Sequence, residues 1–183
     1  MTIPNNLTLA RLLLTPAIAI LAYSPRAAHQ LAALIVFLAA MLTDVLDGYI
    51  ARKFNQRSLL GLYLDTVTDK IIVLAMFFVL ADLGRLPFWV ALLMMAREIV
   101  VDGVRAAGAV QGKVVGANWM GKSKTFLQTI CIALGLALPL TTMAPGTIRI
   151  WVGGFAIFTL SLAWAFAAVF LALNRSLFVE RRG

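Results

Sequence analysis

Residues 43–70 read TDVLDGYIARKFNQRSLLGLYLDTVTDK and place four aspartates between long apolar segments: Asp44, Asp47, Asp65 and Asp69. The whole chain has only eight acidic residues, so half of them lie in this one stretch. An ionised carboxylate is costly at membrane depth unless a cation or a basic group neutralises it. The stretch therefore predicts a functional site and the pair of helices that carries it.

The composition is that of a membrane protein. Hydrophobic residues make up 62% of the 183 residues and charged residues only 13%, which is unlike a soluble globular domain. We expect an all-α, polytopic membrane protein with one domain over residues 1–183 and no cleavable signal peptide. The net charge of +8 does not indicate nucleic-acid binding, because the basic residues punctuate apolar segments instead of forming a stripe on a polar face. The single cysteine, Cys131, excludes an internal disulfide and a cysteine metal cluster, so we expect it to pack in the core.

Six apolar segments predict six transmembrane helices, at residues 7–23, 27–43, 59–80, 87–108, 125–143 and 147–173. A span needs about 20 mostly apolar residues, so the first two must include their flanks. Three short connections on one side carry Arg26, Arg85 and Arg149, whereas the connections on the other side and the C-terminal segment carry ten basic residues. The positive-inside bias therefore predicts a cell-membrane protein whose termini and four aspartates are cytoplasmic.

The aspartates form two pairs with helical spacing. Asp44 and Asp47 are three residues apart and Asp65 and Asp69 are four apart, so each pair lies on one helix face. The basic linker between the pairs predicts an antiparallel hairpin in which they face each other. Clustered carboxylates are stabilised by protonation, basic partners or divalent cations, and oxygen ligands favour Mg²⁺ or Mn²⁺. Two ions about 3.5–4 Å apart would suit displacement at phosphorus; a structural ion-pair network is the alternative.

Small residues accompany the carboxylates. Gly48 and Gly61 would remove side chains beside the metals and let a nucleotide approach. Ala51 would allow close helix packing, and the guanidinium of Arg52 would hold a phosphate oxygen. Helix packing and membrane orientation are the alternative explanations for these residues.

The spaced pattern Asp44-x2-Asp47-Gly48-x2-Ala51-Arg52-x8-Gly61-x3-Asp65-x3-Asp69 resembles the signature of the CDP-alcohol phosphotransferases at every fixed position. Membrane prenyltransferases also have aspartate-rich helices, but the glycines and the Ala-Arg pair do not belong to their pattern. The resemblance implies six transmembrane helices, a homodimer and a polar cavity open to the cytosol.

The resemblance also implies roles for individual residues. The first three aspartates would hold one metal ion, the first, third and fourth would contribute to a second, and the fourth, Asp69, would act as the base. The nucleotide part of the substrate would rest against four residues: Gly48, Arg52, Ser58 and Gly61.

Two further segments bear on the acceptor: AREIVVDGVRAAG at residues 96–108 and GKSKTFLQ at residues 121–128. We expect a second, dianionic phosphate to bind three basic residues: Arg105, Lys122 and Lys124. Orientation signalling is the alternative for the lysines, and buried ion pairing is the alternative for Arg97, Glu98 and Asp102. We expect Arg97 and Glu98 to face different directions, because they are adjacent on a helix.

Together with IPNNLTLARLLLTP at residues 3–16, these segments resemble the phosphatidylglycerophosphate synthase branch of the family. That resemblance implies CDP-diacylglycerol as donor and sn-glycerol 3-phosphate as acceptor, with CMP as the second product. A sister enzyme that uses inositol phosphate or serine is the alternative within the family. An ion or proton transporter is the alternative outside it, but that function predicts acids spread through the bilayer depth.

Overall fold

The computed structural model describes residues 3–53, 59–112 and 119–175, and its side chains are described for residues 10–43, 67–112, 121 and 123–175. Every regular element in these ranges is helical, which confirms the all-α prediction. The six α-helices and one short 3₁₀ turn are α1 (Ile3–Tyr23), α2 (Ala27–Lys53), α3 (Leu59–Asp82), α4 (Phe88–Val110), α5 (Trp119–Ala137), η1 (Leu138–Leu140) and α6 (Pro145–Leu173).

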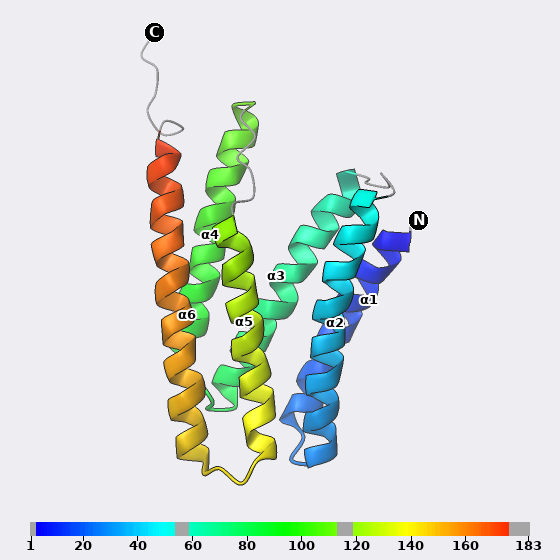
Figure 1. Cartoon of the computed structure of the whole chain (residues 1–183), viewed down its shortest axis with the longest axis vertical. Coiled ribbons are helices and arrows are strands. Elements are labelled where there is room, and N and C mark those ends of the chain that lie inside the picture. The colour runs from blue at the N-terminus through cyan, green and yellow to red at the C-terminus, as the bar shows by residue number, and fades with distance from the viewer. Residues whose placement is uncertain (1–2, 54–58, 113–118, 176–183) are drawn as a thin grey trace.

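Consecutive helices run in opposite directions (Figure 1). The first residues of α1, α3 and α5 and the last residues of α2, α4 and α6 therefore lie toward the same end, the upper end in Figure 1. We call it the site end, because it holds all four aspartates of the motif. Helix α1 packs against α2 and α3, helix α3 also packs against α4 and α5, and α6 packs against α4 and α5. The predicted alternation of the helices is thus confirmed.

The helix bounds differ from the predicted spans mainly at the site end. Helix α2 continues to Lys53, so Asp44 and Asp47 belong to the helix. Helix α5 begins at Trp119 and ends at Ala137, earlier than predicted. The residue before a proline disfavours α-helical geometry, and Leu138 precedes Pro139, where the chain forms the 3₁₀ turn instead.

Two segments of the described chain are long and apolar enough to cross a membrane: Ser123–Leu140 and Pro145–Leu173. Ala10–Tyr23 and Ala27–Thr43 are shorter apolar stretches. Helix α4 does not read as an apolar span, because charged residues such as Arg97 and Glu98 interrupt it. A membrane-spanning role is therefore clear for two helices, and the count of six remains a prediction.

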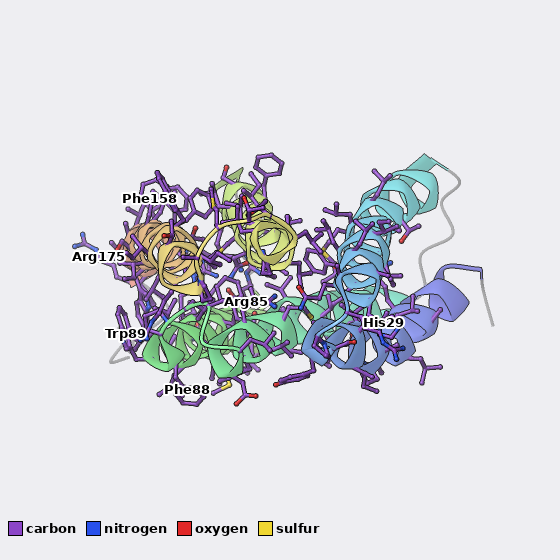
Figure 2. All side chains as sticks on the ribbon, turned by 90° about the horizontal axis from the view of Figure 1, so that it is seen from below. His29, Arg85, Phe88, Trp89, Phe158 and Arg175 are labelled. Atoms are coloured by element: carbon purple, nitrogen blue, oxygen red, sulfur yellow. The ribbon has the colours of Figure 1, made fainter. Side chains whose placement is uncertain are left out.

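The core and the outer surface are both apolar. A single large cluster of buried side chains includes Phe37, Ile72, Phe77 and Ile132, and Cys131 is fully buried, as predicted. Viewed from the opposite end, Phe88, Trp89 and Phe158 point away from the bundle at its periphery (Figure 2). Large apolar side chains on the outside suit contact with lipid tails.

The connection between α3 and α4 is tight, as the sequence predicted. Gly84 has a φ of 70°, a left-handed conformation that glycine adopts without steric cost. The buried Arg85 then reaches α5, where its Nη1 donates a hydrogen bond of 2.9 Å to the carbonyl oxygen of Gly135. The turn therefore ties α3 and α4 to α5.

Gly135 also sets how closely α3 and α5 approach. A Cβ atom added at Gly135 would lie 2.5 Å from Cδ1 and 2.9 Å from Cδ2 of Leu80. Leu80 is fully buried, so its side chain has little room to move. Small residues at such contacts let transmembrane helices pack closely.

We predict that Gly135→Ala lowers the stability of the purified protein by about 1–3 kcal/mol, the usual cost of overpacking a core. Gly154→Ala on α6 is the matched control, because a Cβ atom there meets nothing within 4 Å. The control gains the same helix propensity from the change of glycine to alanine. Thermal unfolding in detergent measures both. Equal midpoints for the two variants would contradict the close contact, and Leu80→Ala should partly rescue Gly135→Ala.

Candidate functional site

The structure places the four aspartates on the two predicted helices at the site end. Asp44 and Asp47 lie on α2, and Asp65 and Asp69 lie on α3, so the predicted helical spacing of both pairs is confirmed. Asp69 is the member whose side chain is described. The side chains of Asp44, Asp47 and Asp65 lie outside the described set, and their convergence remains a prediction.

For the predicted nucleotide contacts too, the structure gives positions on the helices but not side-chain contacts. Gly48 and Arg52 lie on α2 and Gly61 lies on α3, each within a turn or two of the aspartates. The side chain of Arg52 and the surroundings of the two glycines lie outside the part of the structure whose side chains are described. The same holds for the side chain of Lys122, a predicted ligand of the acceptor phosphate. Ser58 falls outside the described residues. The structure thus gives the helical placement of three of these four predicted contacts.

Asp69 is bound by an arginine from the first helix. Arg11 Nη1 donates to Asp69 Oδ1 at 2.6 Å, and the side chains are 2% and 32% exposed. The sequence analysis did not single out Arg11, although a basic residue within an apolar helix was a signal for it. One of the three expected means of stabilising the carboxylates, a basic partner, is therefore present at Asp69.

The next residue on α3 makes a second interhelical ion pair. Lys70 Nζ lies 2.5 Å from both Oδ1 and Oδ2 of Asp102 on α4. This pair is partly exposed, with 23% and 43% of the two side chains accessible. Asp102 and Arg105 are three residues apart on α4, so local spacing would favour Arg105 as the neighbour of Asp102. The ion-pair partner of Asp102 is instead Lys70.

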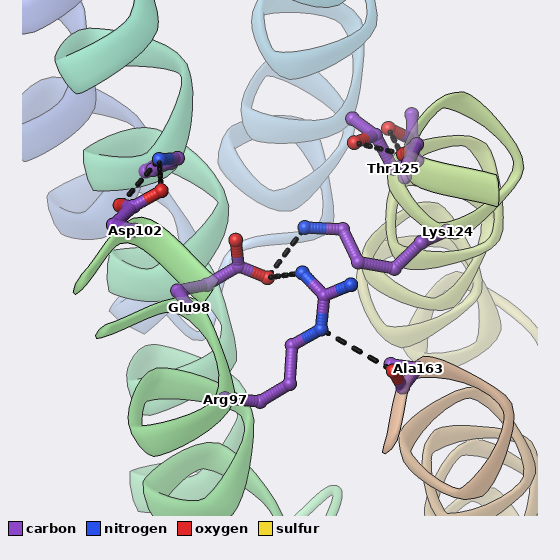
Figure 3. Close-up of polar contacts among 9 residues, drawn as sticks. Arg97, Glu98, Asp102, Lys124, Thr125 and Ala163 are labelled. Atoms are coloured by element: carbon purple, nitrogen blue, oxygen red, sulfur yellow. Dashed lines mark hydrogen bonds and ion pairs between the residues drawn. The ribbon is translucent and has the colours of Figure 1, made fainter. Parts of the chain in front are cut away.

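A buried cluster joins α4, α5 and α6 (Figure 3). Glu98 Oε1 accepts hydrogen bonds from Lys124 Nζ and, at 3.1 Å, from Arg97 Nη1, while Arg97 Nε donates to the carbonyl oxygen of Ala163 at 3.3 Å. All three charged side chains are buried. Buried ion pairing, the alternative explanation for Arg97 and Glu98, is confirmed. The expectation that these two side chains face apart was wrong, because the long arginine side chain reaches back to its neighbour.

The predicted acceptor residues lie at the site end of α4 and α5. The guanidinium of Arg105 lies over the ring of Phe170 at 5.7 Å from its centroid, which is a cation–π contact. Within the described part of the chain, its buried Nε has no hydrogen-bond partner. The Lys124 ammonium group is buried and engaged by Glu98, whereas Arg105 Nε is a buried nitrogen atom without a partner among the described residues.

The donor chemistry fits a divalent cation, although the described side chains alone do not make a metal site. Among them, no group of three or more acids, histidines or cysteines is close enough to share an ion. The four motif aspartates offer only hard oxygen ligands, the kind that Mg²⁺ and Mn²⁺ prefer, and three of them lie outside that search. The residues present are therefore compatible with such ions.

Comparison with known proteins gives a consistent result. The sequence model of the CDP-alcohol phosphatidyltransferase family matches residues 1–173. The CDP-diacylglycerol–glycerol-3-phosphate 3-phosphatidyltransferase of Bacillus subtilis is 34% identical over 90% of this chain and 92% of its own length. The proteins of that name from Escherichia coli K12 and Salmonella choleraesuis are 37% and 36% identical over 85% of this chain and 84% of theirs. The chain belongs to the CDP-alcohol phosphatidyltransferase family.

Proposed function

We propose that this protein transfers the phosphatidyl group of CDP-diacylglycerol to sn-glycerol 3-phosphate and releases CMP. The observation that carries the proposal is the identity of 34–37% with relatives named for this reaction, which extends over most of the chain. The acceptor-side basic residues support it, because this acceptor brings a phosphate of its own. The product, phosphatidylglycerophosphate, serves phospholipid biosynthesis.

We propose that residues 1–183 form one membrane domain with six spans. The helices are 19–29 residues long, and a helix of about 20 residues covers the hydrocarbon core. The excess of basic residues at the site end supports a cytoplasmic position for that end and for both termini. A polar cavity open to the cytosol and a homodimer complete the proposal, as the family resemblance implies.

The metal ligands in this proposal are Asp44, Asp47, Asp65 and Asp69. Two Mg²⁺ or Mn²⁺ ions, when bound, would neutralise the substrate pyrophosphate and the leaving group. Gly48 and Arg52 are four residues apart on α2 and so share a helix face. We assign the nucleotide to that face together with Ser58 and Gly61, where Arg52 would hold a phosphate oxygen.

Asp69 acts as the general base in this proposal. It takes the proton from the acceptor hydroxyl, and the oxygen then forms a bond to the lipid-side phosphorus while the bond from that phosphorus to the CMP oxygen breaks. Positioning and charge neutralisation provide most of the rate enhancement in such transfers. The partial exposure of Asp69 is compatible with access by a polar acceptor.

The acceptor phosphate binds Arg105, Lys122 and Lys124 in this proposal. The buried Nε of Arg105, which lacks a partner among the described residues, is a fitting donor to a phosphate oxygen. Lys124 has three donors on its ammonium group, so its bond to Glu98 leaves capacity for a second acceptor. Glu98 then holds the ammonium group in place.

The reaction is tested by incubating the purified protein with CDP-diacylglycerol, Mg²⁺ and a panel of acceptors, followed by identification of the lipid product. We expect CMP release with glycerol 3-phosphate, and none after chelation of divalent ions by EDTA. Reaction with inositol phosphate or serine in place of glycerol 3-phosphate would make the acceptor assignment wrong. Absence of CMP release with every acceptor would favour a non-enzymatic function such as ion transport.

Asp69→Asn should abolish turnover, because an amide cannot accept the acceptor proton, while part of the nucleotide binding persists. Asp82→Asn is the matched control: Asp82 lies on the same helix at the opposite end and accepts a hydrogen bond of 2.8 Å from the Tyr23 hydroxyl. The control should keep wild-type turnover in the CMP-release assay. Substantial activity in Asp69→Asn would remove this residue from the role of base.

Glu98→Gln should lower stability by about 3–5 kcal/mol, the usual cost of leaving the partners of a buried ion pair uncompensated. Asp102→Asn is the comparison, because its pair with Lys70 is partly exposed and exposed pairs contribute about 0–1 kcal/mol. Denaturant unfolding in detergent micelles measures both. Similar losses in the two variants would show that burial does not control the energetics of these pairs.

A further inference from the structure

Arg11 is the basic residue in α1 that the proposed reaction leaves without a role. Its side chain is 2% exposed, and it reaches α3, one of the two helices against which α1 packs. A charged group in such surroundings is stable only when it is paired. One partner of Arg11 is Asp69 of α3, at 2.6 Å from Nη1 to Oδ1.

A purely structural role does not account well for this pair. Helices α1 and α3 are also joined at the opposite end by the hydrogen bond from the Tyr23 hydroxyl to Asp82, and Ile18 of α1 and Met76 of α3 belong to the same apolar core. Well-packed apolar residues often stabilise a core as well as a buried ion pair does. Holding the two helices together therefore does not require a charge at position 11.

The register of the two contacts places Arg11 at the depth of Asp69. Arg11 and Tyr23 are twelve residues apart on α1, and their partners Asp69 and Asp82 are thirteen apart on α3. Both helices run in the same direction (Figure 1), so the two contacts are separated by roughly 18–20 Å at 1.5 Å per residue. Arg11 thus meets α3 at its motif aspartate and not at a distant turn.

We infer that Arg11 is a positioning residue that holds the Asp69 carboxylate in its working orientation; this inference rests on the proposed function. Asp69 is about one-third exposed, so burial alone does not hold its carboxylate in one orientation. The guanidinium of Arg11 is planar and donates hydrogen bonds in fixed directions. Its burial within the bundle limits its movement. Bound by Arg11, Asp69 is oriented both as a metal ligand and as the proton acceptor of the acceptor hydroxyl.

Four possible roles of Arg11 make different predictions. A positioning residue improves metal binding and turnover, because it orients the ligand. A simple counterion competes with the metal, so its removal tightens metal binding. A structural pair affects neither quantity once the protein is folded, and a direct contact to the acceptor phosphate would appear in the KM of glycerol 3-phosphate.

The test compares Arg11→Met and Arg11→Lys with Tyr23→Phe, which removes the other polar contact between the same two helices. Each full-length variant is purified, its folding is checked by thermal unfolding, and Mn²⁺ binding is measured by electron paramagnetic resonance. In Arg11→Met we expect weaker Mn²⁺ binding and a lower kcat, each by about 10-fold or more, as for outer partners of metal ligands. The KM of glycerol 3-phosphate should stay near wild type, Arg11→Lys should be intermediate, and Tyr23→Phe should be unchanged.

Tighter Mn²⁺ binding in Arg11→Met, an unchanged kcat, or a loss confined to KM would each overturn the inference. Removal of Arg11 leaves the more exposed partner, Asp69, which water can solvate, so we expect the variant to fold. Should Arg11→Met not fold, Arg11→Lys decides, because a structural role predicts wild-type kcat and Mn²⁺ affinity for the folded protein. Wild-type protein that releases no CMP would instead reject the proposed function, so the two failures are distinguishable.

Discussion

The free-energy cost of placing charged side chains inside an apolar bundle constrains this structure throughout. Chains of this composition bury few charges, and each unpaired one would cost several kcal/mol. The described structure meets that cost with pairs between helices: Arg11 with Asp69, Lys70 with Asp102, and the group of Arg97, Glu98 and Lys124. Charge pairing therefore also connects the helices.

Helix α3 has the central position in this network. Its neighbouring residues Asp69 and Lys70 bind α1 and α4 respectively, which is possible because successive side chains point in different directions around a helix. Asp102 and Glu98 then lie one turn apart on α4, and Glu98 continues the network to Lys124 of α5. The helix that carries the proposed base is thus connected through α4 to the helix that carries a proposed phosphate ligand.

Much of the fold was predictable from apolar length and from turn residues. The number, order and alternation of the helices follow from the hydrophobic segments, and Gly84 and Pro145 mark their limits. The end of α2 was not predictable from hydropathy, because the helix continues through the polar residues of the motif as far as Lys53. The ion-pair partners were not predictable either: the sequence offered several bases for each acid, and local spacing favoured Arg105 over Lys70 as the neighbour of Asp102.

The sequence by itself determined the family, the helical class and the residues of the motif, because these depend on residue types at fixed local spacing. Only the tertiary structure decided which charges meet, since pairs such as Arg11 with Asp69 join residues that are 58 positions apart. It also decided that Lys124 is engaged by Glu98. The physical reason is that helical periodicity specifies which residues share a face, whereas the rotation and depth of each helix against its neighbours arise from packing of the whole bundle.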